Sequence, residues 1–350
     1  MPARATLENS MTSGLPIARR ALLLLAASLL SACAQLAPAS DPLPSWNAGP
    51  AKAAIVEFVR KTTDAASPQY VSPAERVVTF DQDGTLWVEQ PMYAQVVFAF
   101  DRVKDVVKAQ PALASEAPFK AVVTGDREAM AKFTEEDLLK IVAASQSGLT
   151  IEAFHAVVKN WAATARHPRF QRPYTELVYA PMVEAMKYLR ANGYRTYIAT
   201  GGGQEFVRAF ADAVYGVPPE QVIGTMLKVD YAVVDGKPTL TNAPGLLFVN
   251  DKAGKPAGIN MMIGRRPQAA FGNSDGDRQM IEWATGGTGA RLGMIVLHDD
   301  AQREFAYGPA AGLPASRLGT FTQALYDEAK KQGWTVISIK NDWKRVFAFD

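Results

Sequence analysis

Cysteine, histidine and excess charge are all scarce in this sequence. The 350 residues include 1 cysteine and 3 histidines. A lone cysteine has no disulfide partner within the chain, and His155, His167 and His298 show no metal-ligand spacing. Lysine plus arginine (37) nearly equals aspartate plus glutamate (35). Residues 1–32 hold three of the arginines and one of the glutamates, so the remainder carries 34 basic and 34 acidic side chains.

These shortages exclude several classes of protein. A balanced chain gives no support for nucleic-acid binding, which needs clustered positive charge. No polybasic run is present that could hold the chain on an anionic membrane. Because 48% of the residues are hydrophobic, the chain can bury a sizeable core. Global disorder, collagen-like repeats and a free-standing coiled coil are therefore excluded.

The amino terminus is typical of a bacterial export signal. Two arginines precede the apolar run 21–30, and the sequence Leu-Ser-Ala-Cys that ends at Cys33 resembles a lipobox. The apolar run is too short to span a membrane as a helix. We therefore expect residues 1–32 to be a lipoprotein signal peptide and Cys33 to carry the lipid. An ordinary signal peptide with a chance cysteine is the alternative, and Met1 and Met11 are both open as the start.

Beyond Cys33 the sequence predicts a tether, a core and an insertion. Alanine, proline and serine are frequent in residues 33–50, which indicates a flexible tether. Alternating strand and helix patterns in residues 51–90 and 178–350 predict an α/β core built on a doubly wound parallel sheet. Residues 91–177 show helical periodicity and are predicted to form an inserted cap. Residues 226–242 have the pattern of a small β-hairpin flap.

Polar segments follow three of the predicted strands, 75–80, 194–199 and 268–271. They are Asp81-Gln82-Asp83-Gly84-Thr85, Thr200-Gly201-Gly202-Gly203 and Asn273-Ser274-Asp275-Gly276-Asp277. In doubly wound sheets, ligands bind outside the carboxyl ends of the strands. We therefore expect the three segments to meet in one crevice.

Four aspartates in these segments predict a metal site: Asp81, Asp83, Asp275 and Asp277. Carboxylates brought together repel one another unless a cation neutralises them. A set of oxygen ligands favours Mg²⁺, which keeps water molecules and accepts phosphate oxygens of a substrate. Which of Asp275 and Asp277 would bind the metal directly is open.

Donors for an anion are present as well. The glycines after Thr200 lie between a strand and a predicted helix, where backbone N–H groups favour an anion. Lys252 and Lys255 compete as the positive side chain, and Lys255 is preferred because Pro256 suits the first turn of a following helix. Carboxylates, a metal, N–H donors and an ammonium together predict a phosphoryl site.

In order and spacing, these segments resemble the motifs of haloacid dehalogenase-like phosphatases over about residues 75–300. The segment beginning at Asp81 is similar to the first motif, Thr200 to the second, Lys255 to the third and Gly272–Asp277 to the fourth. The helical insertion resembles the cap of the phosphoserine-phosphatase branch. The resemblance implies Mg²⁺-dependent hydrolysis of a small phosphomonoester through an aspartyl-phosphate.

The resemblance also implies a role for each site residue. Asp81 is the nucleophile, and Asp83 protonates the leaving group, later deprotonates water and binds Mg²⁺ through its backbone carbonyl. Thr200 holds a phosphoryl oxygen, and Lys255 bridges the phosphoryl group and Asp81. The remaining phosphate- or substrate-binding residues are Gly84, Thr85, Glu89, Gly201 and Gly202.

One position departs from the pattern of the branch, which has aspartate where this chain has Asn273. Asp275 and Asp277 would then supply the metal carboxylates. We expect a phosphatase anchored by lipid to the outer membrane and facing the periplasm, with no nucleic-acid or protein partner. The alternative is a lipid-anchored protein of the same fold that binds or senses a phosphorylated ligand with little turnover. Dehalogenase chemistry is disfavoured because it would leave Asp83 without an acid–base task.

Overall fold

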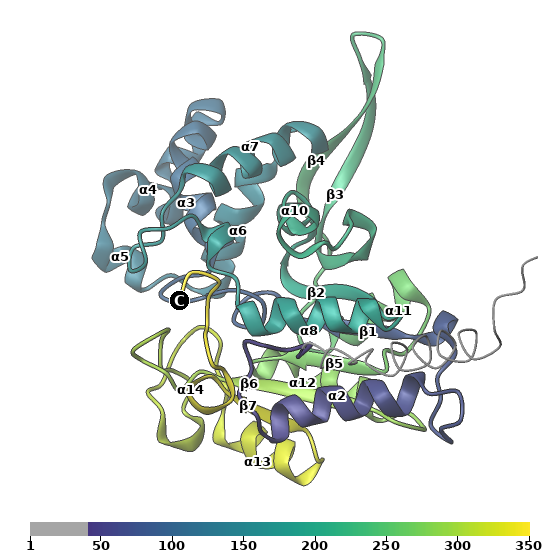
Figure 1. The fold of residues 1–350 in the computed structure, drawn as a ribbon. Helices are drawn as coiled ribbons and strands as arrows, with labels where there is room; N and C mark the ends of the chain where they lie inside the picture. The colour runs from purple at the N-terminus through teal and green to yellow at the C-terminus, as the bar shows by residue number, and fades with distance from the viewer. Residues whose placement is uncertain (1–40) are drawn as a thin grey trace, which may run out of the picture. The chain divides into compact units, whose positions relative to one another are not determined.

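Strand β1 (Val77–Phe80) lies in the middle of a seven-stranded sheet with the order β4-β3-β2-β1-β5-β6-β7 (Figure 1). The computed structural model describes residues 41–350, so Cys33 and the predicted signal peptide lie outside the described residues. Residues Leu43–Asp350 form one compact unit. Neighbouring strands run parallel except β4, which is antiparallel to β3. The predicted doubly wound α/β fold is confirmed.

The strand register brings the predicted polar segments to one edge of the sheet. Phe80 at the end of β1 pairs with Ile198 of β2 and with Phe271 of β5. The segments that follow these three residues in sequence therefore begin at the same level of the sheet. The other strands are β2 (Arg195–Gly203), β3 (Val222–Val234), β4 (Lys237–Phe248), β5 (Ala269–Gly272), β6 (Leu292–Leu297) and β7 (Thr335–Ser338).

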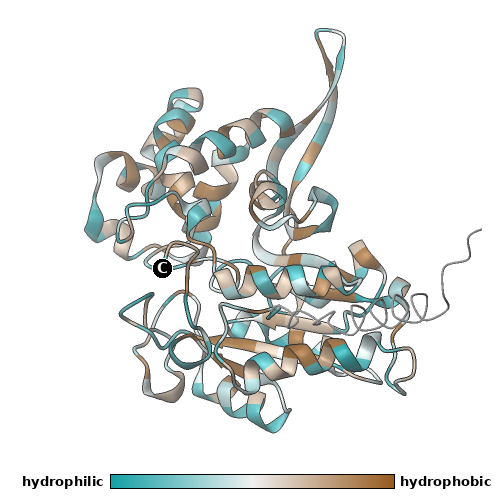
Figure 2. Cartoon of the chain, viewed as in Figure 1, coloured by the Kyte–Doolittle hydropathy of each residue, from teal (hydrophilic) through white to brown (hydrophobic). Residues whose placement is uncertain are grey.

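Two separate apolar clusters lie on the two faces of the sheet. Helices α2 (Pro50–Thr63) and α8 (Ala180–Ala191) pack in one cluster with Val78 and Phe80. Helices α11 (Gly254–Ile263), α12 (Arg278–Thr285) and α13 (Gln323–Lys331) pack in the other with Val77. Side chains of a strand alternate between faces, which is why β1 and β6 contribute to both clusters. Brown marks the hydrophobic residues along the strands of the sheet (Figure 2). Shorter helices are α9 (Gln204–Arg208), α10 (Ala211–Tyr215) and α14 (Ile339–Asp342).

Five helices lie between β1 and α8 in the chain, within the predicted insertion. They are α3 (Ala94–Ala109), α4 (Ala117–Thr124), α5 (Arg127–Ala131), α6 (Glu135–Gln146) and α7 (Ile151–Thr164). Threonine side chains cap the starts of α6 and α7, as the sequence indicates. Helices α3, α4 and α6 share a small core that includes Phe119 and Ile141. Helix α7 instead packs Trp161 against Phe206 of α9, within the main core.

Strands β3 and β4 form a long hairpin that extends away from the sheet (Figure 1). It turns at Asp235 and Gly236, both with positive φ, and is longer than the predicted 226–242. Two backbone hydrogen bonds join it to the loop between α6 and α7. Gly148 N donates to Asn242 O (2.8 Å), and Asn242 N donates to Leu149 O (2.9 Å). None of the helices in residues 41–350 is long and apolar enough to cross a bilayer.

Candidate active site

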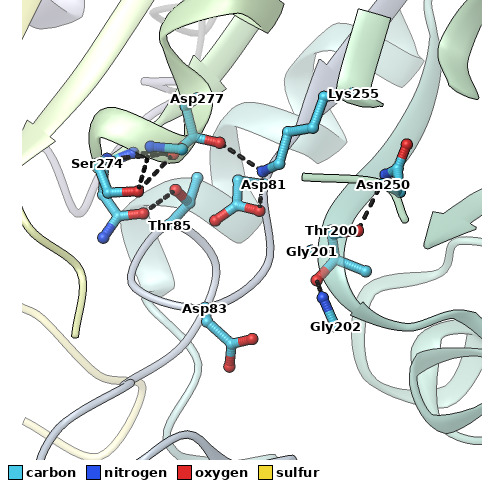
Figure 3. Close-up of polar contacts among 12 residues, drawn as sticks. Asp81, Asp83, Thr85, Thr200, Gly201, Gly202, Asn250, Lys255, Ser274 and Asp277 are labelled. Atoms are coloured by element: carbon cyan, nitrogen blue, oxygen red, sulfur yellow. Dashed lines mark hydrogen bonds and ion pairs between the residues drawn. The ribbon is translucent and has the colours of Figure 1, made fainter. Parts of the chain in front are cut away.

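Asp81 directly follows β1 and is almost fully buried. Its backbone N–H donates to Phe271 O of β5 (2.9 Å), which continues the sheet pairing by one residue. Its side chain accepts from Lys255 Nζ at 2.5 Å. The nucleophile predicted from the sequence therefore lies at the central strand end, in contact with the predicted lysine (Figure 3).

Lys255 is shared between two carboxylates. Its Nζ also donates to Asp277 Oδ1 at 2.5 Å, and all three side chains are withdrawn from solvent. Burial disfavours the ammonium, but the two adjacent carboxylates outweigh it and raise the pKa of Lys255 above its ordinary value. Lys255 therefore remains a cation beside Asp81 across the physiological pH range.

Burial dominates the electrostatics of Asp81. Loss of water raises the pKa of Asp81 to about 8, the nearby Asp277 carboxylate adds to the effect, and Lys255 opposes it. A further cation near Asp81 would favour its charged form. The site thus contains more carboxylates than Lys255 alone can neutralise.

Asp277 accepts hydrogen bonds from the backbone of the loop that follows β5. Its Oδ2 accepts from Asn273 N (2.9 Å) and Ser274 N (3.1 Å), while Oδ1 holds Lys255 (Figure 3). The side chain is 0% exposed and is absent from the lining of the adjacent cleft. Its oxygens are occupied by protein donors, so the arrangement does not support the predicted role of Asp277 as a metal ligand.

Asp275 lies on the same loop and lines the cleft. Its Oδ1 accepts from Thr322 N (3.1 Å) and Thr322 Oγ1 (3.0 Å) at the start of α13. Among residues 41–350, no three acidic, histidine or cysteine side chains are grouped so that they could hold a metal ion. The predicted gathering of four aspartates around one cation is therefore not seen, because Asp277 and Asp275 each have another partner.

Asp83 is set apart from the group formed by Asp81, Lys255 and Asp277 (Figure 3). Its Oδ1 accepts from Trp87 Nε1 at 2.7 Å, and the indole ring is buried. Burial raises the pKa of Asp83 to about 6, although the Trp87 hydrogen bond and Lys255 both lower it. A carboxyl group that titrates near neutrality and faces the cleft is suited to proton transfer.

Thr200 lies inside β2, on the other side of Asp81 from Asp277 (Figure 3). Its Oγ1 accepts from Gly202 N at 2.9 Å, and its backbone carbonyl accepts from Asn250 Nδ2. Gly203 N donates to Gln95 Oε1 at 2.7 Å. The N–H of Gly202, predicted to face an anion, already has a partner, whereas the hydroxyl hydrogen of Thr200 is available to donate. Gly201 and Gly202 both line the cleft.

Gly84 and Thr85 shape the turn after Asp83. Gly84 has a φ of 72°, and a Cβ at this position would collide with the side chains of Asn273 and Glu89. Its carbonyl lies 2.8 Å from His298 Nε2, so that nitrogen carries the proton. Thr85 Oγ1 donates to Asn273 Oδ1 (3.2 Å) and is buried, which ties the turn to the loop after β5.

Glu89 lines the cleft but is otherwise enclosed. Its Oε1 accepts from Asn273 Nδ2 and from Tyr307 OH, both at 2.7 Å. Burial raises the pKa of Glu89 to about 8, while the nearby His298 and the hydrogen bond from Tyr307 lower it. The carboxyl group is thus held in place next to Asp83 and Asp81 by residues distant in sequence.

The cleft itself has a volume of about 950 Å³ and joins the predicted catalytic residues. Asp81, Asp83, Thr200 and Lys255 all line it, together with side chains of α3, α5 and α6. Lys252 also lines it but is 65% exposed, and its nearest carboxylate is Asp251 at 3.9 Å. Of the two lysines left open by the sequence, Lys255 is the one that contacts Asp81.

Several contributing residues were not predicted from the sequence. His298 has no metal-ligand spacing in the sequence and no predicted role, yet it contacts the turn at Gly84 and pairs with buried Glu304 (3.0 Å). It directly follows β6, so the same strand-end rule that selected Asp81 would have selected it. Tyr307 and Gln95 gave no comparable pattern, because their partners lie far away in the chain.

The oxygen donors present are compatible with Mg²⁺. Asp81 is buried and Asp83 is half-buried, the pKa of each carboxyl group is raised, and Lys255 is already shared with Asp277, so a further cation would favour both carboxylates. Carboxylate, backbone carbonyl and amide oxygens are the donors that Mg²⁺ accepts, with water completing its octahedron. Asp81, the carbonyl of Asp83 and an oxygen from the 273–275 segment could supply them.

A doubly wound sheet with a buried carboxylate–lysine pair at its carboxyl edge defines an α/β enzyme site. Residues 78–282, more than half of the chain, match the haloacid dehalogenase-like hydrolase family. The chain belongs to this family of hydrolases. No curated protein matches the chain.

Solved structures resemble the chain only distantly. A conserved protein of unknown function from Anaerococcus prevotii is 16% identical, with a TM-score of 0.49 over 71% of this chain and 86% of that one. A protein of unknown function from Bordetella pertussis is 16% identical, with a TM-score of 0.47 over 75% and 98%. A phosphoserine phosphohydrolase-like protein from Francisella tularensis is 17% identical, with a TM-score of 0.36 over 64% and 88%.

Proposed function

We propose that the protein is a Mg²⁺-dependent phosphomonoesterase that works through an aspartyl-phosphate, as in the phosphoserine-phosphatase branch of its family. The observation that carries the proposal is the pairing of Asp81 with Lys255 at 2.5 Å, in a cleft shared with Asp83 and Thr200. A buried nucleophile, a fixed cation and a separate carboxyl group are the parts that nucleophilic phosphoryl transfer requires.

In the first step, an oxygen of Asp81 attacks phosphorus and the bond from phosphorus to the alcohol oxygen breaks. Asp83 donates its proton to the departing alkoxide, which a pKa near 6 permits close to neutral pH. Lys255 offsets negative charge beside Asp81, and the Thr200 hydroxyl donates to a phosphoryl oxygen.

In the second step, water attacks the phosphorus of the aspartyl-phosphate. Asp83, now ionised, takes the proton from that water, the bond from phosphorus to Asp81 breaks, and inorganic phosphate leaves. Asp83 ends protonated and Asp81 ends free, so the cycle is closed. Bound Mg²⁺ would supply electrostatic stabilisation of the charge on the phosphoryl group.

Asp81, the backbone carbonyl of Asp83 and an oxygen of the 273–275 segment would hold the metal. Asp275 faces the cleft, whereas Asn273 lies behind it and holds Glu89. Titration with Mg²⁺ separates the two candidates. An increase in the Mg²⁺ concentration for half-maximal activity in Asp275→Asn, but not in Asn273→Ser, assigns the third donor to Asp275, and the reverse assigns it to Asn273.

The central test is phosphate release by the full chain from p-nitrophenyl phosphate, with Mg²⁺ and with excess EDTA. We expect activity only with Mg²⁺, and loss of at least a thousandfold in Asp81→Asn. Asp230→Asn, an exposed position on the hairpin, is the matched control. Equal activity in Asp81→Asn would refute the covalent mechanism. Phosphate binding without hydrolysis across a broad phosphoester panel would instead support a sensor protein.

We also propose that Cys33 anchors the protein to the outer membrane through lipid, facing the periplasm. The support is the lipobox-like sequence that ends at this cysteine. Incorporation of labelled palmitate into the protein, and its loss in Cys33→Ser, tests the proposal. Labelling that persists in Cys33→Ser would contradict it.

A further inference from the structure

The cleft is much larger than a phosphate group, and its lining is polar near Asp81 but includes many apolar side chains elsewhere. Its far wall comes from the inserted helices and the hairpin. The side chains there include Phe100, Leu138, Leu139 and Val142 from the insertion, and Leu246 and Val249 from the hairpin segment. We call these six residues the apolar wall. A volume of about 950 Å³ leaves room for a sizeable group beyond the phosphoryl position.

Part of the apolar wall is in contact with water. Leu139 is 38% exposed, Leu246 is 37% exposed and Val249 is 48% exposed, although all three line the cleft. Apolar surface of this kind is stabilised when a ligand covers it, at roughly 25 cal/mol for each Å² removed from water. The wall therefore favours a ligand whose own surface is apolar.

Two polar side chains that line the cleft, Arg317 and Gln90, are engaged within the protein. Arg317 donates to Ala131 O and Phe133 O, both at 2.9 Å, so its guanidinium fixes the backbone beside α5. Gln90 donates to Ser316 Oγ and to Leu318 O. A charged alcohol group beside Arg317 or Gln90 would find donors that are already occupied, and it would lose water without replacement.

Five further charged residues line the cleft, Glu89, Arg127, Asp251, Lys252 and Asp275, and Lys252 is 65% exposed. Arg127 is exposed at the start of α5, at the rim of the cleft. Glu89 is held by Asn273 and Tyr307 at the phosphoryl end. Water weakens an ion pair with either exposed cation, so neither Arg127 nor Lys252 strongly favours a charged alcohol group.

We propose that the substrate is a phosphate monoester of an apolar alcohol, with an alkyl or aryl group seated against the apolar wall. This inference rests on the proposed phosphomonoesterase function and specifies its substrate class. The phosphoryl group lies at Asp81 and Lys255, and the alcohol carbon skeleton extends toward α6 and the hairpin. Reaction by the steps given above releases the apolar alcohol and inorganic phosphate.

A substrate series tests the chemistry of the wall. The full chain is assayed with ethyl, butyl, hexyl and octyl phosphate below their micelle concentrations, and with phenyl and 1-naphthyl phosphate. O-phosphoserine, glycerol 3-phosphate and phosphocholine serve as polar comparisons. We expect kcat/KM to rise up to about fourfold for each added methylene that is buried. A larger gain along the aryl pair than along the alkyl series identifies a ring as the group bound, and the reverse identifies a chain.

Variants of exposed residues test the position of the alcohol without risk to folding. Leu139→Asn is expected to lower the ratio of octyl to ethyl kcat/KM about tenfold. Leu247→Asn, which is 65% exposed and does not line the cleft, is the matched control and should leave the ratio unchanged. A flat dependence on chain length, or a polar comparison that exceeds octyl and naphthyl phosphate, would overturn the inference.

Failure of the proposed function gives a different pattern. If no ester in the panel is hydrolysed, including p-nitrophenyl phosphate, the phosphatase proposal fails. Calorimetric binding of octyl and ethyl phosphate then tests the apolar wall by itself. Tighter binding of the octyl ester supports the wall as an apolar subsite, and equal or absent binding overturns it.

Discussion

Replacement of Asp277 by asparagine distinguishes a lysine partner from a metal ligand. Asp277 accepts Lys255 at 2.5 Å with Oδ1 and two backbone N–H groups with Oδ2. Asparagine retains an oxygen for the backbone groups, but its amide nitrogen would then face the lysine ammonium, donor against donor. The loss is therefore confined to the contact with Lys255.

The magnitude follows from the burial of the pair. Removing one partner of a buried ion pair costs about 3–5 kcal/mol, and Asp81 still accompanies Lys255, so we expect the lower end, about 3 kcal/mol. For a unit of this size that is about 5 °C in Tm. We further expect kcat to fall about 10- to 100-fold, because Lys255 is no longer held beside Asp81 from both sides.

The assay is urea unfolding of the full chain in excess EDTA, repeated with Mg²⁺, for Asp277→Asn and the exposed control Asp230→Asn. A lysine partner predicts the loss of stability in both conditions. A metal ligand predicts that the variant matches the parent in EDTA and differs only with Mg²⁺. Unchanged stability in EDTA would refute our assignment of Asp277.

Two more substitutions are expected to lower the free energy of unfolding. Burial raises the pKa of Glu205, but its hydrogen bond to His155 (2.8 Å) and its pair with Arg208 (2.7 Å) outweigh burial and lower the pKa below 4.5. The stabilisation of the folded state is present above pH 4.5 and is lost as the pH falls through the folded pKa. Glu205→Gln should therefore lower the free energy of unfolding by about 1 kcal/mol at pH 7 and by progressively less in acid. Urea unfolding at several pH values measures this difference. We expect Gly84→Ala to lower the free energy of unfolding by more than about 2 kcal/mol and to abolish activity. An alanine at this positive φ is strained, and its Cβ would also collide with neighbouring side chains. Gly236→Ala, at a similar φ in open space, should show the strain alone, and equal losses in the two variants would contradict the collision.

The sheet could be predicted from the sequence because its strands are short, apolar runs that end in polar segments. The strands predicted at 75–80, 194–199 and 268–271 overlap β1, β2 and β5, and the polar segments after them reach one edge as the strand-end rule requires. The first part of β3 was not predicted as a strand, because Val222 and Ile223 form too brief an apolar run before a glycine.

The partners of the aspartates could not be predicted in the same way. An aspartate in a polar loop has the same pattern whether it faces a metal, a lysine or a helix start. Asp277 meets Lys255, 22 positions earlier, and Asp275 meets Thr322, 47 positions later. Only the packing of α11, α12 and α13 on one face of the sheet decides these pairings.

The hydrogen bonds between Asn242 and the loop at Gly148 and Leu149 add to the attachment of the inserted helices, of which α7 already packs Trp161 against Phe206 in the core. A cap joined only by its two chain connections can swing open on them. Here the two backbone hydrogen bonds of Asn242 also connect the insertion to the hairpin. An outward rotation of the insertion must therefore either break these bonds or move the hairpin with it. The insertion then serves as a fixed wall of the cleft, and ligand exchange depends on movement of the side chains that line it.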